Sequence, residues 1–390
     1  SLGNMAYTGI FPKNLKTVVP EGILTLVICK FCKLVQLDRN FSSKKMYGMN
    51  YGYRTSLNKS MKKHILNKKK FLSNIKKLKK NSTILDIGSN DGTFLNSFDR
   101  SKFKLVGIDP TIKKFNKYYR SGIIKSSNFF SYKNFNQIAK KSKANLITSF
   151  SMFYDLQDPL KFTKDIYKCL DKNGIWHFEQ SYMPSMLKNT SYDTICHEHV
   201  EYYSLTPIAK MLKNAGLKII DVKMNGVNGG SFAISACHKD AYKKHSCDIL
   251  DWLLAREEKS GYSTPSPYRE FEKTIFDHKK SLQKLIQEIK ERGKTIHAYG
   301  ASTKGNVLLQ FCGFTQNDIP YAAEINPYKY GRVTPGSNIP IISAEESKRM
   351  RPDYYLVLPW HFKEGIIRKE KNYLTEGGNL IFPLPEIEIF

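Results

Sequence analysis

The fold of this 390-residue chain is decided by one stretch, ILDIGSNDGTFL at residues 84–95. Its apolar start belongs to a run over 83–87 that we expect to form a buried β-strand. The strand passes into a turn with two glycines, which let the backbone come close to a ligand, and we expect a helix over 93–98. A strand, a glycine-rich turn and a helix in this order indicate an α/β fold whose ligand binds beyond the carboxyl ends of the strands.

Strands and helices alternate in the sequence around this stretch. Further strands are predicted over 105–108, 122–125, 145–150 and 174–179, and a strand pair over 218–224 and 231–238. Such alternation is typical of a parallel sheet that helices cover on both faces. A lysine-rich helix is predicted over 60–80, because its apolar residues recur at steps of three and four.

A second β-α region follows a long helical stretch over 240–292, which a loop at 261–267 interrupts. Its strands are predicted over 295–299, 321–324, 354–359 and 379–382. The turn at 300–305 leads into a helix predicted over 306–311. We therefore expect two α/β domains, at 61–240 and 241–390, behind an irregular segment at 1–60.

The composition excludes several classes of protein. Its 41% hydrophobic and 25% charged residues are ordinary for a soluble globular chain. No apolar run approaches the roughly 20 residues of a membrane helix, and no signal peptide is visible at 1–12. Seven scattered cysteines are typical of a reducing compartment. We expect a cytoplasmic protein without a membrane partner.

The net charge of +27, from 62 Lys+Arg against 35 Asp+Glu, is the unusual feature. Such a balance favours an anionic partner. However, lysine greatly outnumbers arginine, and other residues with A/T-rich codons are plentiful, so codon composition accounts for much of the excess. The lysines of the 60–80 helix are expected on a solvated face. We therefore expect no nucleic-acid partner.

The glycine-rich turn predicts a particular cofactor. A dinucleotide site would need a full G-x-G-x-x-G pattern with pyrophosphate at the helix N-terminus. Here Asn90 and an aspartate stand between Gly88 and Gly92, and acidic groups suit the cationic, phosphate-free S-adenosylmethionine (SAM). Asp109, at the tip of the next strand, can grip the ribose hydroxyls, and Asp86 can hold the amino-acid moiety. A structural tight turn without a ligand is the alternative.

The stretch after the fifth strand carries two histidines that flank a glutamate, His197-Glu198-His199. Two imidazoles beside a carboxylate suit a general base with a pKa near neutrality. A metal site is the rival interpretation, but a third ligand is not evident and the H-E-x-x-H zinc pattern is absent. A polar loop with a hydrogen-bonded histidine is the other alternative.

Taken together, these features resemble the SAM-dependent sugar C-methyltransferases of deoxysugar and branched-sugar pathways. The resemblance covers nearly the whole chain and rests on residues 29–37, 51–56, 84–95, 194–199, 229–231, 299–306 and 324–327. The glycine-rich turn alone is generic. Its combination with the His-Glu-His loop and the turn at Gly300 is specific to this family.

The resemblance implies a class I SAM-methyltransferase domain at 61–240 and a Rossmann-like domain at 241–390 that helps bind a nucleotide-sugar. It also implies a small zinc-module-like segment at 1–60. In the implied reaction, a 4-keto nucleotide-sugar loses a proton beside its ketone, and the enolate carbon takes the methyl group of SAM. A sugar C–H is too weak an acid for methylation unless a carbonyl acidifies it, so a base and an enolate stabiliser are required.

The family pattern implies His199 as the base and Glu198 as a group that contacts the substrate or orients the loop. Tyr53 or Tyr51 would reach the sugar or the enolate oxygen, although a core role for Tyr53 is the alternative. The pathway would be deoxysugar or surface-polysaccharide biosynthesis.

Cys196 and His197 would line the substrate pocket, and Ser151 would join the cofactor site. Family members often carry tyrosine in place of Cys196 and asparagine in place of Ser151, which leaves the exact sugar open. Methyl transfer needs no thiol nucleophile.

In the C-terminal domain, Ser302, Thr303 and Asn306 would lie at a helix N-terminus, where pyrophosphate can bind. Lys304 would add a cation there. Glu324 is a weaker candidate for contacts with the sugar or the base, and so is Lys329.

The zinc module of the family uses two C-x-x-C pairs, whereas this region has only Cys29 and Cys32. Because tetrahedral zinc needs four ligands, we expect no complete zinc site in this chain. Zinc would bind only if a first cysteine pair lies upstream.

Three other functions remain open at this stage. They are a small-molecule O- or N-methyltransferase, an RNA-interacting SAM-domain protein and a catalytically silent homologue. For a C-methyltransferase we expect a monomer.

Overall fold

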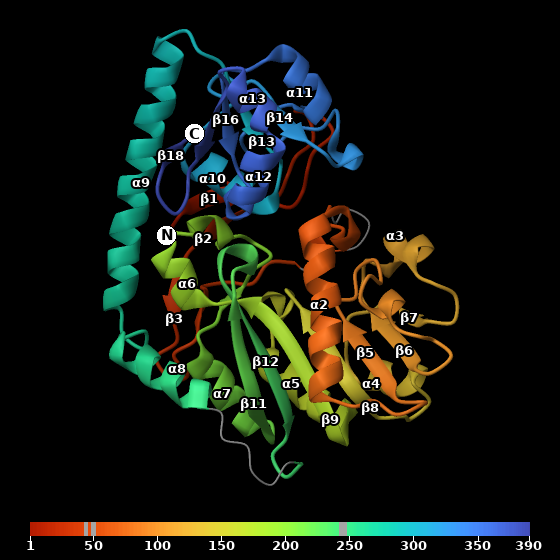
Figure 1. Cartoon of the computed structure of the whole chain (residues 1–390). Helices are drawn as coiled ribbons and strands as arrows, with labels where there is room; N and C mark the ends of the chain where they lie inside the picture. Colours follow the sequence, from red (N-terminus) through yellow and green to blue (C-terminus); the bar gives the residue numbers. More distant parts are fainter. Residues whose placement is uncertain (43–45, 48–51, 242–247) are drawn as a thin grey trace.

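A computed structural model describes residues 1–42, 46–47, 52–241 and 248–390. Figure 1 shows two α/β units, one above the other, with a long helix along their common side. The predicted α/β fold class, with two Rossmann-like sheets, is confirmed. Within the described ranges, no helix is both long and apolar enough to cross a membrane.

The first α/β unit is built on a seven-stranded sheet with the order β7-β6-β5-β8-β9-β12-β11. Its strands are β5 (Thr83–Ile87), β6 (Lys104–Ile108), β7 (Ile124–Ser126), β8 (Ala144–Phe150), β9 (Leu170–Ser181), β11 (Leu217–Asn225) and β12 (Ser231–His238). All neighbours are parallel except β12, which runs antiparallel to both β9 and β11. The strands predicted in this region are therefore all present, including the closing strand pair.

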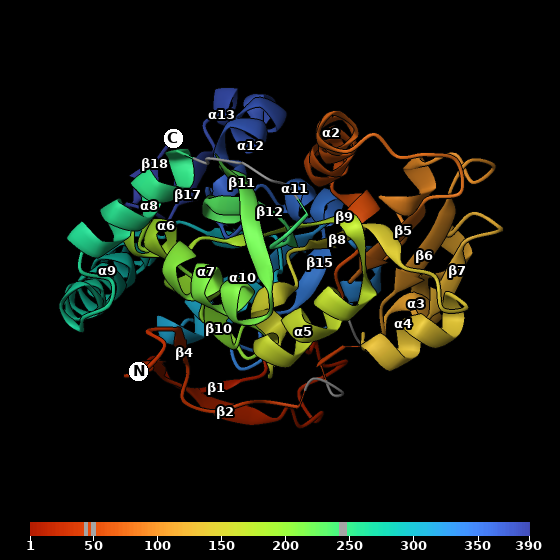
Figure 2. The same cartoon turned by 90° about the horizontal axis from the view of Figure 1, so that it is seen from below.

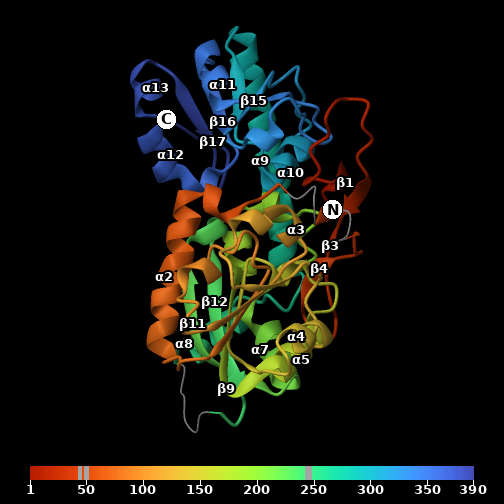
Figure 3. The same ribbon diagram turned by 90° about the vertical axis from the view of Figure 1, so that its right-hand side faces the viewer.

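Helices cover both faces of this sheet (Figures 2 and 3). Helix α2 (Lys59–Ile75) lies on one face, and α4 (Tyr132–Ile138), α5 (Pro159–Cys169) and α7 (Leu205–Asn214) lie on the other. Asn58 caps the N-terminus of α2, and its side chain accepts hydrogen bonds from two backbone N–H groups of the first turn. The helix ends at Ile75, before the predicted end at 80.

The prediction of a helix over 93–98 is wrong. Only one 3₁₀ turn, η2 (Leu95–Ser97), follows the glycine-rich turn. Side chains compete with the helical backbone here, because Asp91 accepts from the backbone N–H of Thr93 at 3.3 Å and the Ser97 hydroxyl donates to the Phe94 carbonyl at 2.6 Å.

The second α/β unit has a six-stranded sheet with the order β15-β14-β13-β16-β17-β18, parallel except for β18. Its strands are β13 (Ile296–Tyr299), β14 (Ala322–Glu324), β15 (Ile341–Ser343), β16 (Tyr354–Val357), β17 (Asn379–Phe382) and β18 (Glu388–Ile389). The helices are α10 (Thr303–Phe311), α11 (Ala344–Met350), α12 (Lys363–Lys369) and α13 (Lys371–Thr375). Two helices, α8 (Asp248–Lys259) and α9 (Ser266–Glu291), connect the units, and α9 runs along the second one (Figure 1).

The N-terminal segment packs against both units. Strands β1 (Gly3–Ala6) and β2 (Glu21–Leu24) pair with each other, while β3 (Leu26–Ile28) and β4 (Val35–Leu37) form a small sheet with β10 (Glu201–Tyr202). One apolar cluster joins Leu2 and Leu24 to the core of the second unit. The segment therefore contacts both units.

Candidate active site

The glycine-rich turn has the geometry that its glycines permit. Gly88 and Gly92 adopt left-handed φ angles of +71° and +73°, which disfavour any residue with a Cβ. A Cβ on Gly92 would lie 2.8 Å from the ring of Tyr119. The Tyr119 hydroxyl in turn donates to the Asn90 carbonyl at 2.9 Å. The turn is thus fixed tightly beyond the carboxyl end of β5.

Two acidic side chains flank this turn. Asp109, directly after β6, accepts hydrogen bonds from the backbone N–H groups of Asn90 at 2.8 Å and Thr111 at 2.6 Å. Each carboxylate oxygen retains a second lone pair for a hydroxyl group. Asp86, on β5, is buried and accepts from the Thr148 hydroxyl at 2.7 Å. Burial and the charge of Asp109 raise the pKa of Asp86 to about 7.

Ser151 completes this edge of the sheet. It follows β8 directly and has a left-handed φ of 51°. Its backbone N–H donates to the Glu179 carbonyl at 2.7 Å, and its hydroxyl accepts from the Asn228 amide at 3.4 Å. Because β8 lies beside β5, Ser151 is brought to the same end of the sheet as Gly88 and Asp86.

This set of residues fits SAM. Asp86 and Asp109 are both buried, and burial raises the pKa of both carboxyls. A cationic ligand that also carries a pair of ribose hydroxyls would compensate both carboxylates. The residues predicted for the cofactor therefore meet at one edge of the sheet.

The Asn90 side chain has a different partner from the one expected. Its Oδ1 accepts from the backbone N–H of Thr55 at 3.0 Å, and its Nδ2 donates to the Tyr53 carbonyl at 3.3 Å. Asp91 accepts from the Ser56 N–H at 3.0 Å. The side chains of the turn thus hold the segment 52–56, called the strap below, and leave the turn backbone and the neighbouring acids to face a cofactor.

The strap also contacts the second unit. The Asn326 side chain donates to the Gly52 carbonyl at 3.1 Å. The strap therefore bridges the two units. Tyr53, predicted to reach the substrate, belongs to it and keeps 42% of its surface exposed. Tyr51 lies outside the described residues.

His199 is oriented by one hydrogen bond and one ring contact. Its Nδ1 lies 2.9 Å from the Thr194 carbonyl oxygen. A carbonyl can only accept, so Nδ1 carries the proton and the lone pair remains on Nε2. The ring centroid lies 4.4 Å from that of Tyr154. Burial and the positive charge of Lys304 lower the pKa of His199 to about 3, so the expectation of a pKa near neutrality is wrong for this state.

Glu198 and Cys196 lie together near the same loop. The Cys196 thiol donates to the Glu198 carboxylate at a sulfur–oxygen distance of 3.8 Å. Burial raises the pKa of Glu198 to about 7, although the charge of Lys329 opposes this shift. Asp155, which the sequence analysis missed, contributes a further buried carboxyl, and its charge acts on Cys196.

His197 points the other way. Its ring stacks on Tyr7, with centroids 4.6 Å apart, and meets Phe41 edge-on. Its Nε2 lies 3.3 Å from the Gly22 carbonyl. His197 therefore packs against the N-terminal segment, which differs from the pocket-lining role expected. Glu198 borders the same segment, because a Cβ on Gly9 would lie 1.9 Å from its Oε1.

The residues that were predicted to bind pyrophosphate at the start of α10 differ in what they contact. The Ser302 hydroxyl caps the helix by accepting from the Gly305 N–H at 3.0 Å, and Thr303 is the first helical residue. Asn306 is fully buried and donates to the Thr8 carbonyl at 2.7 Å, so it holds the N-terminal segment. Lys304 Nζ donates to the Asn228 carbonyl at 3.3 Å.

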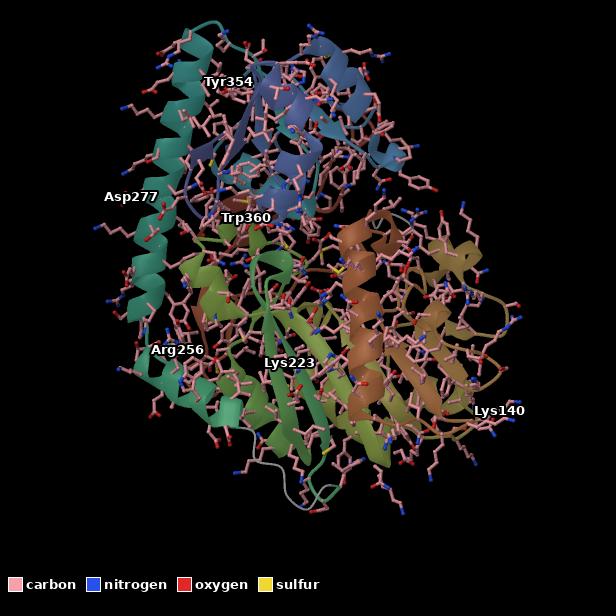
Figure 4. All side chains as sticks on the ribbon, in the orientation of Figure 1. Lys140, Lys223, Arg256, Asp277, Tyr354 and Trp360 are labelled. Atoms are coloured by element: carbon pink, nitrogen blue, oxygen red, sulfur yellow. The ribbon has the colours of Figure 1, made fainter. Side chains whose placement is uncertain are left out.

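Lys304 thus enters the junction between the two units. Burial lowers its pKa, whereas Asp193 and Cys196 act in the opposite direction. Asp193 was missed in the sequence analysis, although it opens the stretch with the two histidines. It is buried and accepts a hydrogen bond from the indole N–H of Trp360 at 2.8 Å. Figure 4 shows Trp360 where the second unit meets the first.

Glu324, expected to contact the sugar or base, ends β14. Its carboxylate accepts from the N–H groups of Ile325 at 2.8 Å and Asn326 at 3.0 Å. It also forms an ion pair with Lys329 at 3.3 Å. These contacts order the loop after β14 and bring Lys329 near Glu198.

Cys29 and Cys32 lie in the turn between β3 and β4. Backbone N–H groups of Cys32 and Phe31 lower the pKa of Cys29, whereas burial raises that of Cys32. Across the described ranges, no three or more His, Cys, Asp or Glu side chains are grouped so that they could hold a metal ion. Two thiols alone do not fit tetrahedral zinc, so no role is assigned to a metal.

The chain matches two family models. One, described as a C-methyltransferase C-terminal domain, matches residues 226–385, and the other, described as a methyltransferase domain, matches residues 57–222. C-methyltransferase NovU of Streptomyces niveus is 30% identical over 364 residues, which cover 93% of this chain and 86% of that protein.

Solved structures give weaker similarities. A SAM-dependent methyltransferase from Clostridium acetobutylicum has 16% identity and a TM-score of 0.35, over 45% of this chain and 89% of its own. Magnesium protoporphyrin IX methyltransferase from Synechocystis, with bound SAM, has 9% identity and a TM-score of 0.34, over 46% and 79%. TM-scores this low support no comparison of one site with another.

Proposed function

The chain belongs to the C-methyltransferase family of SAM-dependent enzymes, and from this premise we propose that it methylates a nucleotide-linked 4-keto sugar. The methyl group would go to the carbon beside the ketone. The product would enter deoxysugar or surface-polysaccharide biosynthesis. We further propose that residues 61–240 hold SAM, that residues 241–390 hold the nucleotide-sugar and that the reaction takes place between them.

The observation that carries this proposal is the hydrogen bond from His199 Nδ1 to the Thr194 carbonyl, at 2.9 Å. It leaves Nε2 as a neutral acceptor, which is the form that a general base needs. Abstraction of the proton beside the ketone would give an enolate on the sugar and an imidazolium on His199. SAM, when bound, supplies the electrophilic methyl group that the enolate carbon takes.

An enolate needs a positive charge or a hydrogen-bond donor at its oxygen. Lys304 is a candidate, because its ammonium is near enough to His199 to lower the pKa of the imidazole. Its first-turn position on α10, next to Ser302 and Thr303, supports a contact with the substrate. The hydroxyl of Tyr53 is the second candidate for this oxygen. Glu198 would contact the sugar from the same loop.

The first experiment separates proton abstraction from methyl transfer. A 4-keto nucleotide-sugar is incubated in deuterated water with the enzyme and S-adenosylhomocysteine but no SAM, and deuterium uptake beside the ketone is followed by mass spectrometry. We expect uptake with the wild-type chain and none with His199→Ala, while both bind S-adenosylhomocysteine with the same affinity. Wild-type uptake by His199→Ala would overturn the assignment of the base.

The second experiment separates carbon from oxygen or nitrogen methylation. A substrate that carries deuterium beside the ketone is methylated, and the product is analysed. Loss of that deuterium supports methylation at carbon. Its retention in a methylated product would instead favour an O- or N-methyltransferase.

A further inference from the structure

Tyr154 lies between the proposed base and the cofactor edge of the candidate active site. It belongs to η4 (Phe153–Asp155), the short 3₁₀ turn that follows β8 and Ser151. Its backbone carbonyl accepts a hydrogen bond from the N–H of Val200 at 2.9 Å, and Val200 directly follows His199. Tyr154 is therefore tied both to the end of β8 and to the loop that carries the proposed base.

The ring of Tyr154 packs against the imidazole of His199. The two ring centroids lie 4.4 Å apart, with their planes at 62°, which is an edge-to-face arrangement. The tyrosine side chain is buried, so its ring keeps its place. The hydrogen bond from His199 Nδ1 to the Thr194 carbonyl fixes only one atom of the imidazole. The contact with Tyr154 supplies a second restraint on the orientation of this ring.

The hydroxyl of Tyr154 contacts the cofactor edge of the sheet. Burial and the charge of Asp155 raise the pKa of the phenol well above its ordinary value of 10, and a hydrogen bond from the Ser151 hydroxyl opposes this shift. The Ser151 hydroxyl in turn accepts from the Asn228 amide at 3.4 Å. Since Ser151 is one of the residues expected to hold the cofactor, the Tyr154 hydroxyl restrains the position of that site.

Building on the proposed function, we propose that Tyr154 is a positioning residue that aligns the base with the cofactor. The carbon that gives its proton to His199 is the carbon that takes the methyl group, so the base and the methyl donor must keep a fixed relative position. His199 and Ser151 come from separate elements, and Tyr154 contacts both. Its ring holds the imidazole for proton abstraction, and its hydroxyl holds Ser151 for methyl transfer.

The role of the ring is tested without substrate, by nitrogen magnetic resonance of labelled histidine. At neutral pH, His199 should have a protonated Nδ1 and an unprotonated Nε2. Tyr154→Phe keeps the ring and should keep this pattern, whereas Tyr154→Leu should give a mixture of the two neutral tautomers. Phe153→Leu makes the same change at the neighbouring core residue and should leave the pattern unchanged. A wild-type pattern in a folded Tyr154→Leu would overturn the role of the ring.

The role of the hydroxyl is tested by the binding of S-adenosylhomocysteine, followed by calorimetry. Tyr154→Phe and Ser151→Ala should each weaken binding by about fivefold, as for one lost hydrogen bond between neutral groups. Because both act through the same bond, the double variant should bind no more weakly than Ser151→Ala. Tyr355→Phe is the matched control, since it breaks another buried tyrosine–serine hydrogen bond, in the second unit. Wild-type affinity in Tyr154→Phe would overturn the role of the hydroxyl.

Kinetics show whether the two contacts act on different steps. Deuterium uptake beside the ketone should stay near wild type in Tyr154→Phe, while kcat for methylation falls. In Tyr154→Leu, both deuterium uptake and kcat should fall by about tenfold or more, because a misplaced base costs at least this much. The KM for the sugar should change little in either variant. Equal losses of deuterium uptake in both variants would contradict the division of roles between ring and hydroxyl.

The two proposals fail in different ways. If the chain methylates a keto nucleotide-sugar but both variants of Tyr154 keep the wild-type kcat and the wild-type tautomer of His199, Tyr154 is not a positioning residue, and the proposed function stands. If the tautomer and the cofactor affinity depend on Tyr154 as expected but no keto nucleotide-sugar is methylated, the role of Tyr154 stands and the proposed function fails. Circular dichroism and urea unfolding verify that each variant is folded.

Discussion

The low pKa of His199 keeps its imidazole in the deprotonated form that a general base needs. A general base acts in its deprotonated form, and a pKa of about 3 leaves His199 deprotonated at any pH above about 4. We therefore expect no titration of His199 near 6.5, the pKa of an unperturbed histidine. Lys304→Met removes a positive charge and should raise the pKa of His199 by about 1.

Nuclear magnetic resonance of histidine-labelled protein measures this pKa directly. The His199 signal is assigned by its absence in His199→Gln, and Lys113→Met provides a control for the loss of an exposed lysine. If His199 titrates near 6.5 in the wild-type chain, its pKa is not lowered as expected. If its pKa is the same in Lys304→Met as in the wild-type chain, Lys304 does not act on it.

The buried carboxylate of Asp86 should destabilise the folded chain, although we expect it to contribute to cofactor binding. Its folded pKa of about 7 lies above the ordinary aspartate value of 3.8, so the folded state binds more protons than the unfolded state between these values. Stability is therefore lost as the pH rises from about 4 to 7. Asp86→Asn keeps the acceptor for Thr148 and removes this loss, so the free energy of unfolding at pH 8 should rise by about 2–4 kcal/mol.

Urea unfolding at pH 4 and pH 8 tests the Asp86 prediction, because the gain should be small at the lower pH. The same variant should bind S-adenosylhomocysteine more weakly. Asp99→Asn, at an exposed acid, is the control and should change stability little. An equal effect of Asp86→Asn at both pH values would show that the buried charge is not its cause.

At the scale of elements, α2 carries a buried ionic cluster under its lysine-rich surface. His64 Nε2 lies 2.5 Å from Glu179 Oε1, and Lys68 forms an ion pair with the same carboxylate. Asn225 donates to it at 2.9 Å. Burial raises the pKa of Glu179, but His64 and Lys68 lower it overall. The cluster thus fastens α2 to the end of β9.

Removing one partner of Glu179 should destabilise the folded chain. Lys68→Met leaves a buried carboxylate with too few partners, and we expect the free energy of unfolding to fall by about 3 kcal/mol at pH 7. The deficit should shrink below the ordinary pKa of a glutamate, where Glu179 becomes protonated. Lys70→Met, at an exposed lysine of the same helix, should have almost no effect.

A double variant provides the second test of this cluster. Adding Glu179→Gln to Lys68→Met removes the carboxylate that lost its partner and should restore part of the stability. If the two changes are simply additive in urea unfolding, Lys68 does not stabilise α2 through Glu179.

The elements show how far the sequence alone can predict this molecule. Many strands were predictable because buried strands are short apolar runs between turns, and β5, β12 and β17 have the bounds expected from the sequence. The absence of a helix after the glycine-rich turn was not predictable, because side chains there bond to the local backbone. Lys68 was expected on a solvated face, since a glutamate distant in sequence gives no local signal.

The sequence also predicted part of the candidate site. Asp86, Asp109 and Ser151 meet at one edge of the sheet because strand ends are local features. The roles of His197, Asn90 and Asn306 were not, because their partners Gly22, Thr55 and Thr8 come from the N-terminal segment. Which way a side chain points depends on such distant contacts.

For the whole molecule, the junction between the two units depends on Trp360. Its indole N–H donates to the buried carboxylate of Asp193 at 2.8 Å. Gly229 packs so closely on its ring that a Cβ there would lie 2.9 Å away. Burial raises the pKa of Asp193, while the charge of Lys304 and this hydrogen bond oppose the shift. Trp360 therefore fixes the second unit relative to the loop that carries His199.

Trp360→Phe keeps an aromatic ring and removes the donor. Since it leaves a buried carboxylate without one partner, we expect the free energy of unfolding to fall by about 1–3 kcal/mol. The KM for the sugar substrate should rise, because Lys304 and the loop lose their relative position, while the affinity for S-adenosylhomocysteine should not change. Trp252→Phe, at a tryptophan that is 55% exposed, is the control. An equal loss of S-adenosylhomocysteine affinity in Trp360→Phe would mean that Trp360 supports the cofactor site itself and not the fit between the units.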